Sequence, residues 1–123
     1  MRKGLKGWKL VSGLLLLVAA GLPSSQGQTP HDVKRVEIAA KRFSYEPSEI
    51  TLKRGRRVEL VLNSTDATHG FAVQELGIHL VAKEGAHDEV TFTPNKAGEF
   101  TGKCNVFCGT GHSSMRITVK VID

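Results

Sequence analysis

The segment CNVFCGTGHSSM, residues 104–115, gathers four potential metal ligands into twelve positions. It contains both cysteines of the 123-residue chain, followed by His112 and Met115. Thiolate and thioether sulfurs are soft ligands, and imidazole binds copper and zinc well. Structural zinc sites use cysteine, histidine and carboxylates rather than methionine. This set of donors therefore favours a copper site.

A blue-copper site needs two imidazole ligands, so a second histidine must come from outside the segment. His69 is the best candidate, because it stands in DATHGFAV (residues 66–73) at the start of a predicted strand. The loops of a β-sandwich gather at its two ends, so His69 can lie at the same end as residues 104–115. His79 and His87 lie in a polar stretch without companion donors, which is typical of surface histidines.

The pair Cys104 and Cys108 allows three interpretations. A structural disulfide is open to an exported chain, but it would close a small ring and remove little chain entropy. One cysteine could instead be a spectator beside a mononuclear copper site. Alternatively, both thiolates could bridge two copper ions, with the imidazoles and Met115 completing the ligand set.

The rest of the sequence has the pattern of an all-β domain. Apolar and polar residues alternate with period two in short runs, as expected for half-buried strands. Turn segments such as KRGRR (residues 53–57) separate the runs, and no eleven-residue window after residue 27 has convincing helical periodicity. These features predict a β-sandwich. Strands are expected around residues 36–40, 50–52, 58–62, 69–73, 90–92, 100–104 and 117–121.

The N-terminus is predicted to be a leader. Four basic residues and no acidic residue precede an apolar run over residues 10–22, and small polar residues follow. This order is typical of a secretory signal peptide, and the run is shorter than the roughly 20 residues that a membrane-spanning helix needs. We predict a signal peptide, or alternatively a short membrane anchor, over residues 1–27, a linker over 28–35 and the domain over 36–123.

This organisation predicts export, to the periplasm or the outer face of the cytoplasmic membrane. A retained anchor would associate the domain with the membrane. Residues 28–123 carry 13 basic and 12 acidic side chains, so the basic character of the whole chain belongs mostly to the leader. Such a balance gives no case for a nucleic-acid partner.

Three motifs together resemble the CuA domain of cytochrome c oxidase subunit II. Residues 104–115 match its C-x-x-x-C-G-x-x-H-x-x-M pattern, and DATHGF (66–71) matches an upstream D-x-x-H-[SG]-[FW] pattern. FSYEPSEITLKRG (43–55) resembles the opening F-x-Y-x-P-x-x-I-x-[LV]-x-x-G of the family. The similarity covers residues 36–122, and the double motif is far more specific than a lone CxxxC.

The resemblance implies a cupredoxin-like Greek-key β-sandwich or barrel with a mixed-valence centre of two copper ions. Its ligands would include the bridging thiolates of Cys104 and Cys108, and the imidazoles of His69 and His112, each of which would bind one ion. The thioether of Met115 and the backbone carbonyl of Val106 would be weak ligands.

The function that the resemblance implies is one-electron relay, from a redox protein such as cytochrome c toward a haem–copper oxidase subunit. Such a domain has no active site of its own. The sequence departs from the family at Val106, where Glu or Gln is usual, and at Ile117, where Gly is usual. A periplasmic copper chaperone or storage protein that uses the same ligands is the alternative function.

Overall fold

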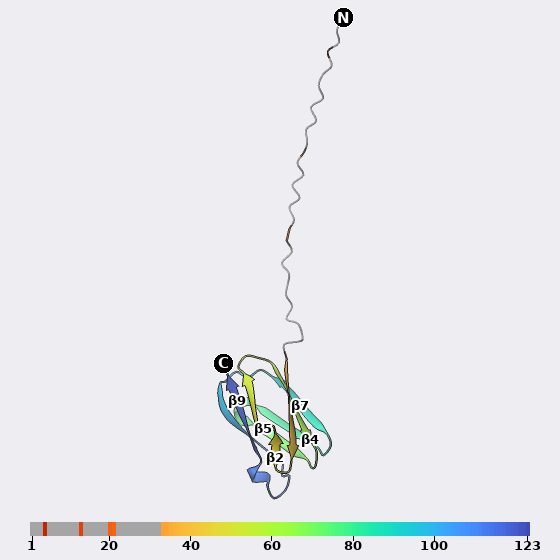
Figure 1. Cartoon of the computed structure of the whole chain (residues 1–123), viewed down its shortest axis with the longest axis vertical. Coiled ribbons are helices and arrows are strands. Elements are labelled where there is room, and N and C mark those ends of the chain that lie inside the picture. Colours follow the sequence, from red (N-terminus) through yellow and green to blue (C-terminus); the bar gives the residue numbers. More distant parts are fainter. Residues whose placement is uncertain (1–3, 5–12, 14–19, 22–32) are drawn as a thin grey trace.

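The computed structural model describes residues 4, 13, 20, 21 and 33–123 (Figure 1). The predicted leader over residues 1–27 and most of the linker lie outside these residues. No described helix is long and apolar enough to cross a membrane. The described strands and 3-10 helices are β1 (Lys34–Lys41), β2 (Ser44–Glu46), β3 (Glu49–Lys53), β4 (Val58–Ser64), β5 (His69–Val73), η2 (Gln74–Leu76), β6 (Ile78–Ala82), β7 (His87–Phe92), β8 (Gly98–Lys103), η3 (His112–Ser114) and β9 (Arg116–Ile122).

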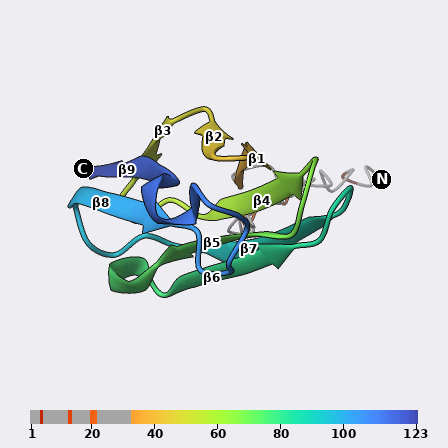
Figure 2. The same cartoon turned by 90° about the horizontal axis from the view of Figure 1, so that it is seen from below.

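The strands form two sheets that enclose one core, which confirms the predicted β-sandwich. One sheet has the order β2-β1-β4-β7, and the other has the order β3-β9-β8-β5-β6. The pairs β1 with β4 and β3 with β9 are parallel, and the remaining pairs are antiparallel. Figure 2 shows the sandwich end-on, from the end that carries the loop before β9.

The core follows from the alternation in the sequence, because every second residue of a strand points to the same face. In β9 the side chains of Ile117, Val119 and Val121 are buried between more exposed neighbours. The strand β4 lies between β1 and β7 and is buried along most of its length. The same core also contains Cys104, Cys108 and Met115, so three sulfur-bearing side chains of the loop are part of the hydrophobic interior.

The sequence-based strands differ from the structure chiefly at β1, β2, β6 and β7. The strand β1 begins two residues before Val36, because Lys34 aligns with Val58 in the parallel ladder and its N–H donates to the carbonyl of Arg57 at 3.0 Å. The expected strands do not include β2 or β6, and β7 begins at His87 rather than at Val90. Both missed strands form hairpins with the strand before them. The three residues of β2 are too few to show alternation, whereas Ile78, Leu80 and Ala82 of β6 do alternate with more exposed neighbours.

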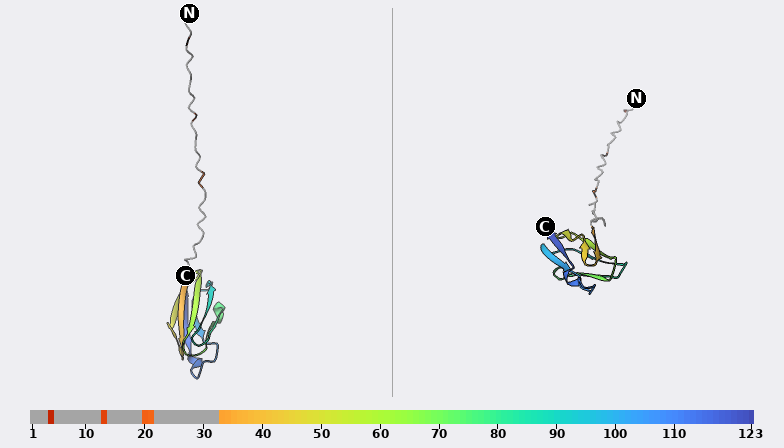
Figure 3. Two further views of the ribbon diagram at one scale, coloured as in Figure 1. Left: turned by 90° about the vertical axis from the view of Figure 1, so that its right-hand side faces the viewer. Right: turned by 60° about the horizontal axis from the view of Figure 1, so that its bottom comes forward.

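The connections that matter for the site meet at one end of the sandwich. The strands β1, β4 and β8 run toward this end, and β5 and β9 start from it. As a result, residues 42–43, 65–68 and 104–115 lie together, at the end opposite to the C-terminus. Figures 1 and 3 show the blue loop before β9 at this end in each view.

We expect Gly102→Ala to destabilise the sandwich, because Gly102 lies where β8 crosses the core. A Cβ atom there would stand 2.6 Å from Cγ2 of Ile117 and 2.9 Å from Cε2 of Phe71. Overpacking of this kind costs about 1–3 kcal/mol of unfolding free energy, which chemical denaturation would measure. The exposed neighbour Thr101 provides the control Thr101→Ala, and equal stability of the two variants would contradict this account.

Candidate metal centre

The loop 104–115 closes between the ends of β8 and β9. The Cys104 N–H donates to the Met115 carbonyl at 3.4 Å, and η3 forms the last turn before β9. The loop packs on the ring of Phe43. A Cβ atom added at Gly109 would lie 2.8 Å from this ring, and one added at Gly111 would overlap it. Gly109 has φ +137°, which favours glycine. Gly111 has φ −92°, so its lack of a side chain serves the packing on Phe43 rather than an unusual backbone conformation.

Three buried side chains form the centre of the site. The ligand atoms of His69, Cys104 and Cys108 all lie within 4.8 Å of one another. His69 enters from the first residue of β5, and the cysteines come from the loop. Both cysteines are free thiols, with their sulfurs 3.5 Å apart. The distant histidine singled out in the sequence therefore does reach the sulfurs, as the sandwich topology predicted.

The other three expected residues surround this centre. The carbonyl of Val106 accepts from the Cys104 thiol at 3.0 Å, and Met115 Sδ lies 3.8 Å from Cys108 Sγ. His112 Nδ1 lies 3.7 Å from the same Cys108 sulfur. The structure thus brings all six residues together, whereas His79 and His87 are exposed on β6 and β7.

The orientation of His69 is set by Asp66. Nε2 of His69 lies 2.7 Å from Oδ1 of Asp66, and since a carboxylate only accepts hydrogen bonds, Nε2 carries the proton. With the proton on Nε2, Nδ1 can present its lone pair. This atom is buried and has no hydrogen-bond partner among the described residues. Such an orphaned polar atom requires an explanation, and a metal ion bound there would supply one.

Arg42 connects the turn after β1 to both sides of the site. Its backbone N–H donates to Oδ2 of Asp66 at 2.9 Å, and its Nε donates to the Cys108 carbonyl at 3.2 Å. The first of these bonds is the main reason why the pKa of Asp66 is below its usual value, and the bond to His69 adds to it. Asp66 therefore stays ionised and keeps accepting from His69.

Tyr45 and Gly70 hold the other sulfur. The Gly70 N–H donates to Cys104 Sγ at 3.4 Å, while the Tyr45 hydroxyl donates to the Gly70 carbonyl at 2.6 Å. Burial raises the pKa of Tyr45 above its usual range, and the two nearby thiols add to the rise, so the hydroxyl remains a donor. Hydrogen bonds of this kind orient ligands and tune the metal that they bind.

The Cys108 thiol is protonated when no cation is bound. Burial, followed by the neighbouring Cys104, raises the pKa of Cys108 to about 11. Metal ions bind the thiolate form, so a metal ion entering this site has to displace protons. The fit is therefore that of a soft cation: sulfur and imidazole donors converge, and no carboxylate joins the ligating cluster among the described residues.

Sequence reasoning missed the supporting residues rather than the proposed ligands. Asp66 precedes His69 by three residues within the quoted motif, so its role could have been inferred. Arg42 is separated from Cys108 by 66 positions and Tyr45 from Gly70 by 25. Only the topology shows that these residues meet.

The comparisons with known sequences point to one family. Residues 32–122 match the family described as "Cytochrome C oxidase subunit II, periplasmic domain". The chain is 32% identical over 94 residues to cytochrome c oxidase subunit 2 of Thermus thermophilus, covering 76% of this chain and 70% of that protein. It spans 56% of the corresponding subunit of a named strain of the same species, again at 32% identity over 76% of this chain.

Solved structures have the same fold. A chain of a heme-copper terminal oxidase dimer superposes with a TM-score of 0.67 at 25% identity, over 85% of this chain and 76% of that one. The periplasmic domain of subunit II of the Bradyrhizobium japonicum cytochrome oxidase superposes with a TM-score of 0.66 at 19% identity, over 73% and 84%. The sequence match and the shared cupredoxin-like fold confirm the resemblance noted above, and the chain belongs to the family of the cytochrome c oxidase subunit II periplasmic domain.

Proposed function

We propose that this protein is an exported electron carrier with a dinuclear copper centre of the CuA type. Two observations on His69 carry this proposal: its buried Nδ1 lacks a partner among the described residues, and a ring nitrogen of this residue lies within 4.8 Å of the sulfurs of two buried free thiols. An uncommitted imidazole lone pair in an apolar core beside two sulfurs is what a soft metal ion requires. Family membership and the heme-copper oxidase among the similar structures support copper as that metal.

Each expected ligand has a role in this proposal. The two cysteine sulfurs would be shared between the ions, and Nδ1 of His69 and Nδ1 of His112 would each bind one. Met115 Sδ and the Val106 carbonyl would be the weak outer ligands. Their positions next to the sulfurs, at 3.8 Å from Cys108 and 3.0 Å from Cys104 respectively, support this assignment.

Bound copper would supply a one-electron redox couple. The chain's own contribution is to keep the ligands fixed between the two oxidation states. Cys104, Cys108 and Met115 are packed in the core, and Asp66 and the Gly70 N–H hold His69 and Cys104 in place. Ligands that are oriented before the reaction need little rearrangement. The apolar packing also limits the access of water.

The location follows from the family, which is that of a periplasmic domain. We further propose that residues 1–27 direct export and that residues 28–35 connect this leader to the domain. A redox protein such as a cytochrome c as electron donor, and a haem–copper oxidase subunit as acceptor, are part of the same proposal.

We expect the purified protein to bind about two copper ions per chain. Because both sulfurs would be shared, the oxidised protein should give an EPR spectrum with hyperfine splitting from two equivalent copper nuclei rather than one. Metal analysis and EPR measure both properties. A single copper ion, or tight binding of zinc in preference, would contradict the proposal. Colourless Cu(I) that is released readily would indicate a copper chaperone instead.

Replacing His69 by alanine should abolish the visible absorption of the copper-loaded protein, because one imidazole ligand is removed from a buried site. His79→Ala is the matched control, since His79 is exposed on β6 and should leave the spectrum unchanged. Cys108→Ser distinguishes the mononuclear alternative, in which a centre on Cys104 would persist. A spectrum that survives in His69→Ala would exclude His69 as a ligand.

A further inference from the structure

The face above the proposed copper centre has an exposed aromatic ring at its middle. Phe107 is 77% exposed and is adjacent in sequence to Cys108, and its ring centroid lies 5.7 Å from that of His112. The other large apolar side chain that is exposed among the described residues, Ile122, lies at the opposite end of β9. An exposed aromatic residue amid polar neighbours is a common centre of a protein contact.

A shallow hollow next to this ring leads to the site. Its volume is about 330 Å³. The lining residues are Arg42, Ala67, Thr68, Phe107, Cys108 and Gly109. A partner bound on Phe107 would therefore contact the loop that carries Cys108. Its redox centre could then come close to the proposed copper centre, as electron exchange requires.

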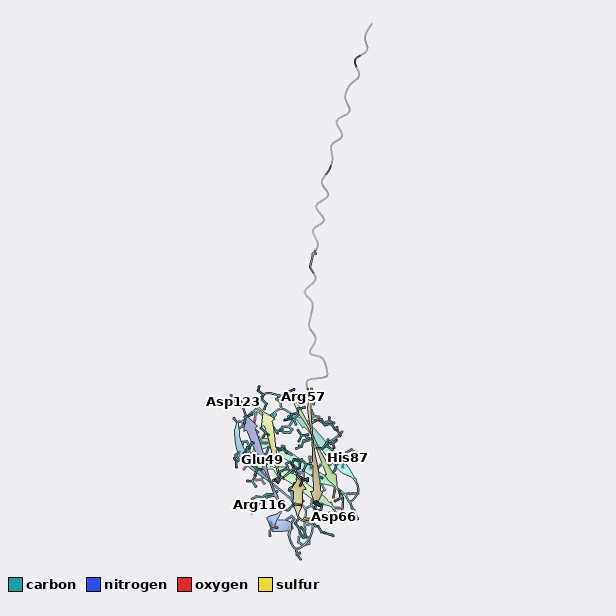
Figure 4. All side chains as sticks on the ribbon, viewed as in Figure 1. Glu49, Arg57, Asp66, His87, Arg116 and Asp123 are labelled. Atoms are coloured by element: carbon teal, nitrogen blue, oxygen red, sulfur yellow. The ribbon has the colours of Figure 1, made fainter. Side chains whose placement is uncertain are left out.

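The charges around this face are mostly positive. Lys41 ends β1 and Arg42 follows it on one side of the loop, and Lys103 and Arg116 are cross-strand neighbours on the other. All four are exposed, and we call them together with Phe107 the basic rim. Figure 4 labels Arg116 and Asp66 at this end of the molecule.

Acidic groups offset the basic rim only in part. Asp66 is occupied by the Arg42 backbone N–H and His69. Glu75 and Glu99 line a separate hollow together with Lys103 and Arg116 and moderate the charge on that side of the loop, but among the described residues neither makes a salt bridge with a rim cation.

The rim cations have no internal ion-pair partners. Within the part of the chain that the structure describes, Lys41, Lys103 and Arg116 make no salt bridge, and Arg42 uses its Nε on a carbonyl. Some cations elsewhere are paired, for example Lys120 with Glu49 at 3.1 Å. Residues 28–123 are nearly neutral overall, but the turn at residues 53–57 at the other end is also basic. The rim is therefore distinguished by its place around Phe107, where its charges would orient a partner of opposite charge.

We propose that the basic rim docks a redox protein whose contact face carries carboxylates around an apolar patch. This inference rests on the proposed electron-transfer function and specifies the chemistry of its partner. The apolar patch would cover Phe107, and the carboxylates would pair with the four cations. A partner with a basic contact face is disfavoured, because like charges that meet at an interface repel.

The test uses two c-type cytochromes of similar size as probes, one acidic and one basic. The purified, isotope-labelled protein is titrated with each at low and high ionic strength, both copper-free and copper-loaded, and the affinity and the perturbed amides are measured by NMR. We expect the acidic probe to bind at least about tenfold more tightly than the basic one at low salt. The difference should shrink as salt rises, and the perturbed amides should centre on Phe107. Tighter binding of the basic probe, or equal binding of both, would overturn the proposal.

Two sets of variants identify the surface. The double variant Lys41→Glu with Arg116→Glu should lower the affinity for the acidic probe about tenfold or more. The variant Phe107→Ala should lower the same affinity about tenfold. The matched control is Lys53→Glu with Lys96→Glu, which makes the same charge change at the other end of the sandwich and should alter binding less than about twofold. Equal effects of the two double variants would overturn the proposal. It would also be overturned if the Phe107 amide signal changed when the protein was diluted without a probe, because the patch would then bind a second copy of the chain.

Binding and copper content separate the two proposals. If the copper-free protein binds the acidic probe through the rim but takes up only one copper ion, the dinuclear function fails and the docking surface stands. If two coppers bind but the acidic probe does not, the docking surface fails alone.

Discussion

One carboxylate, that of Asp66, fixes the position of the site relative to the strands. Asp66 accepts the Arg42 backbone N–H with one oxygen and the His69 ring N–H with the other, and the Arg42 side chain donates to the Cys108 carbonyl. Three connections from different strands are thereby fixed relative to one another. Without Asp66 the ring of His69 would lack the partner that fixes its proton on Nε2, and the lone pair of Nδ1 would no longer be directed into the site.

Burial gives this arrangement its strength. His69 is completely inaccessible to solvent, and the two cysteines and Met115 belong to the hydrophobic core. Side chains at the packing density of a protein interior cannot change position without moving their neighbours. The same burial keeps the Cys108 thiol protonated until a cation displaces the proton. The core therefore acts both as the support of the fold and as the frame of the site.

The sequence predicted the class of fold, and it singled out residues that the structure brings together, for different reasons. Alternation identified strands such as β4 and β9, because one face of each is buried. It failed for β2, which has three residues and a single buried side chain, that of Tyr45. Cys104 and Cys108 were visible because their spacing is local. Arg42 and Tyr45 could not be found in this way, since their contacts with the site join residues distant in sequence, and a sequence pattern holds no record of which loops share an end.

The packing of the loop on Phe43 limits how the site could be transplanted. Gly109 and Gly111 lie against this ring because they lack side chains, and the ring belongs to the turn after β1 rather than to the loop. A graft of residues 104–115 alone into another sandwich would leave the two glycines without the aromatic ring against which they pack. The unit that evolution or an engineer can move is therefore discontinuous: it comprises the loop, the aromatic residue beneath it and the turn that presents that residue.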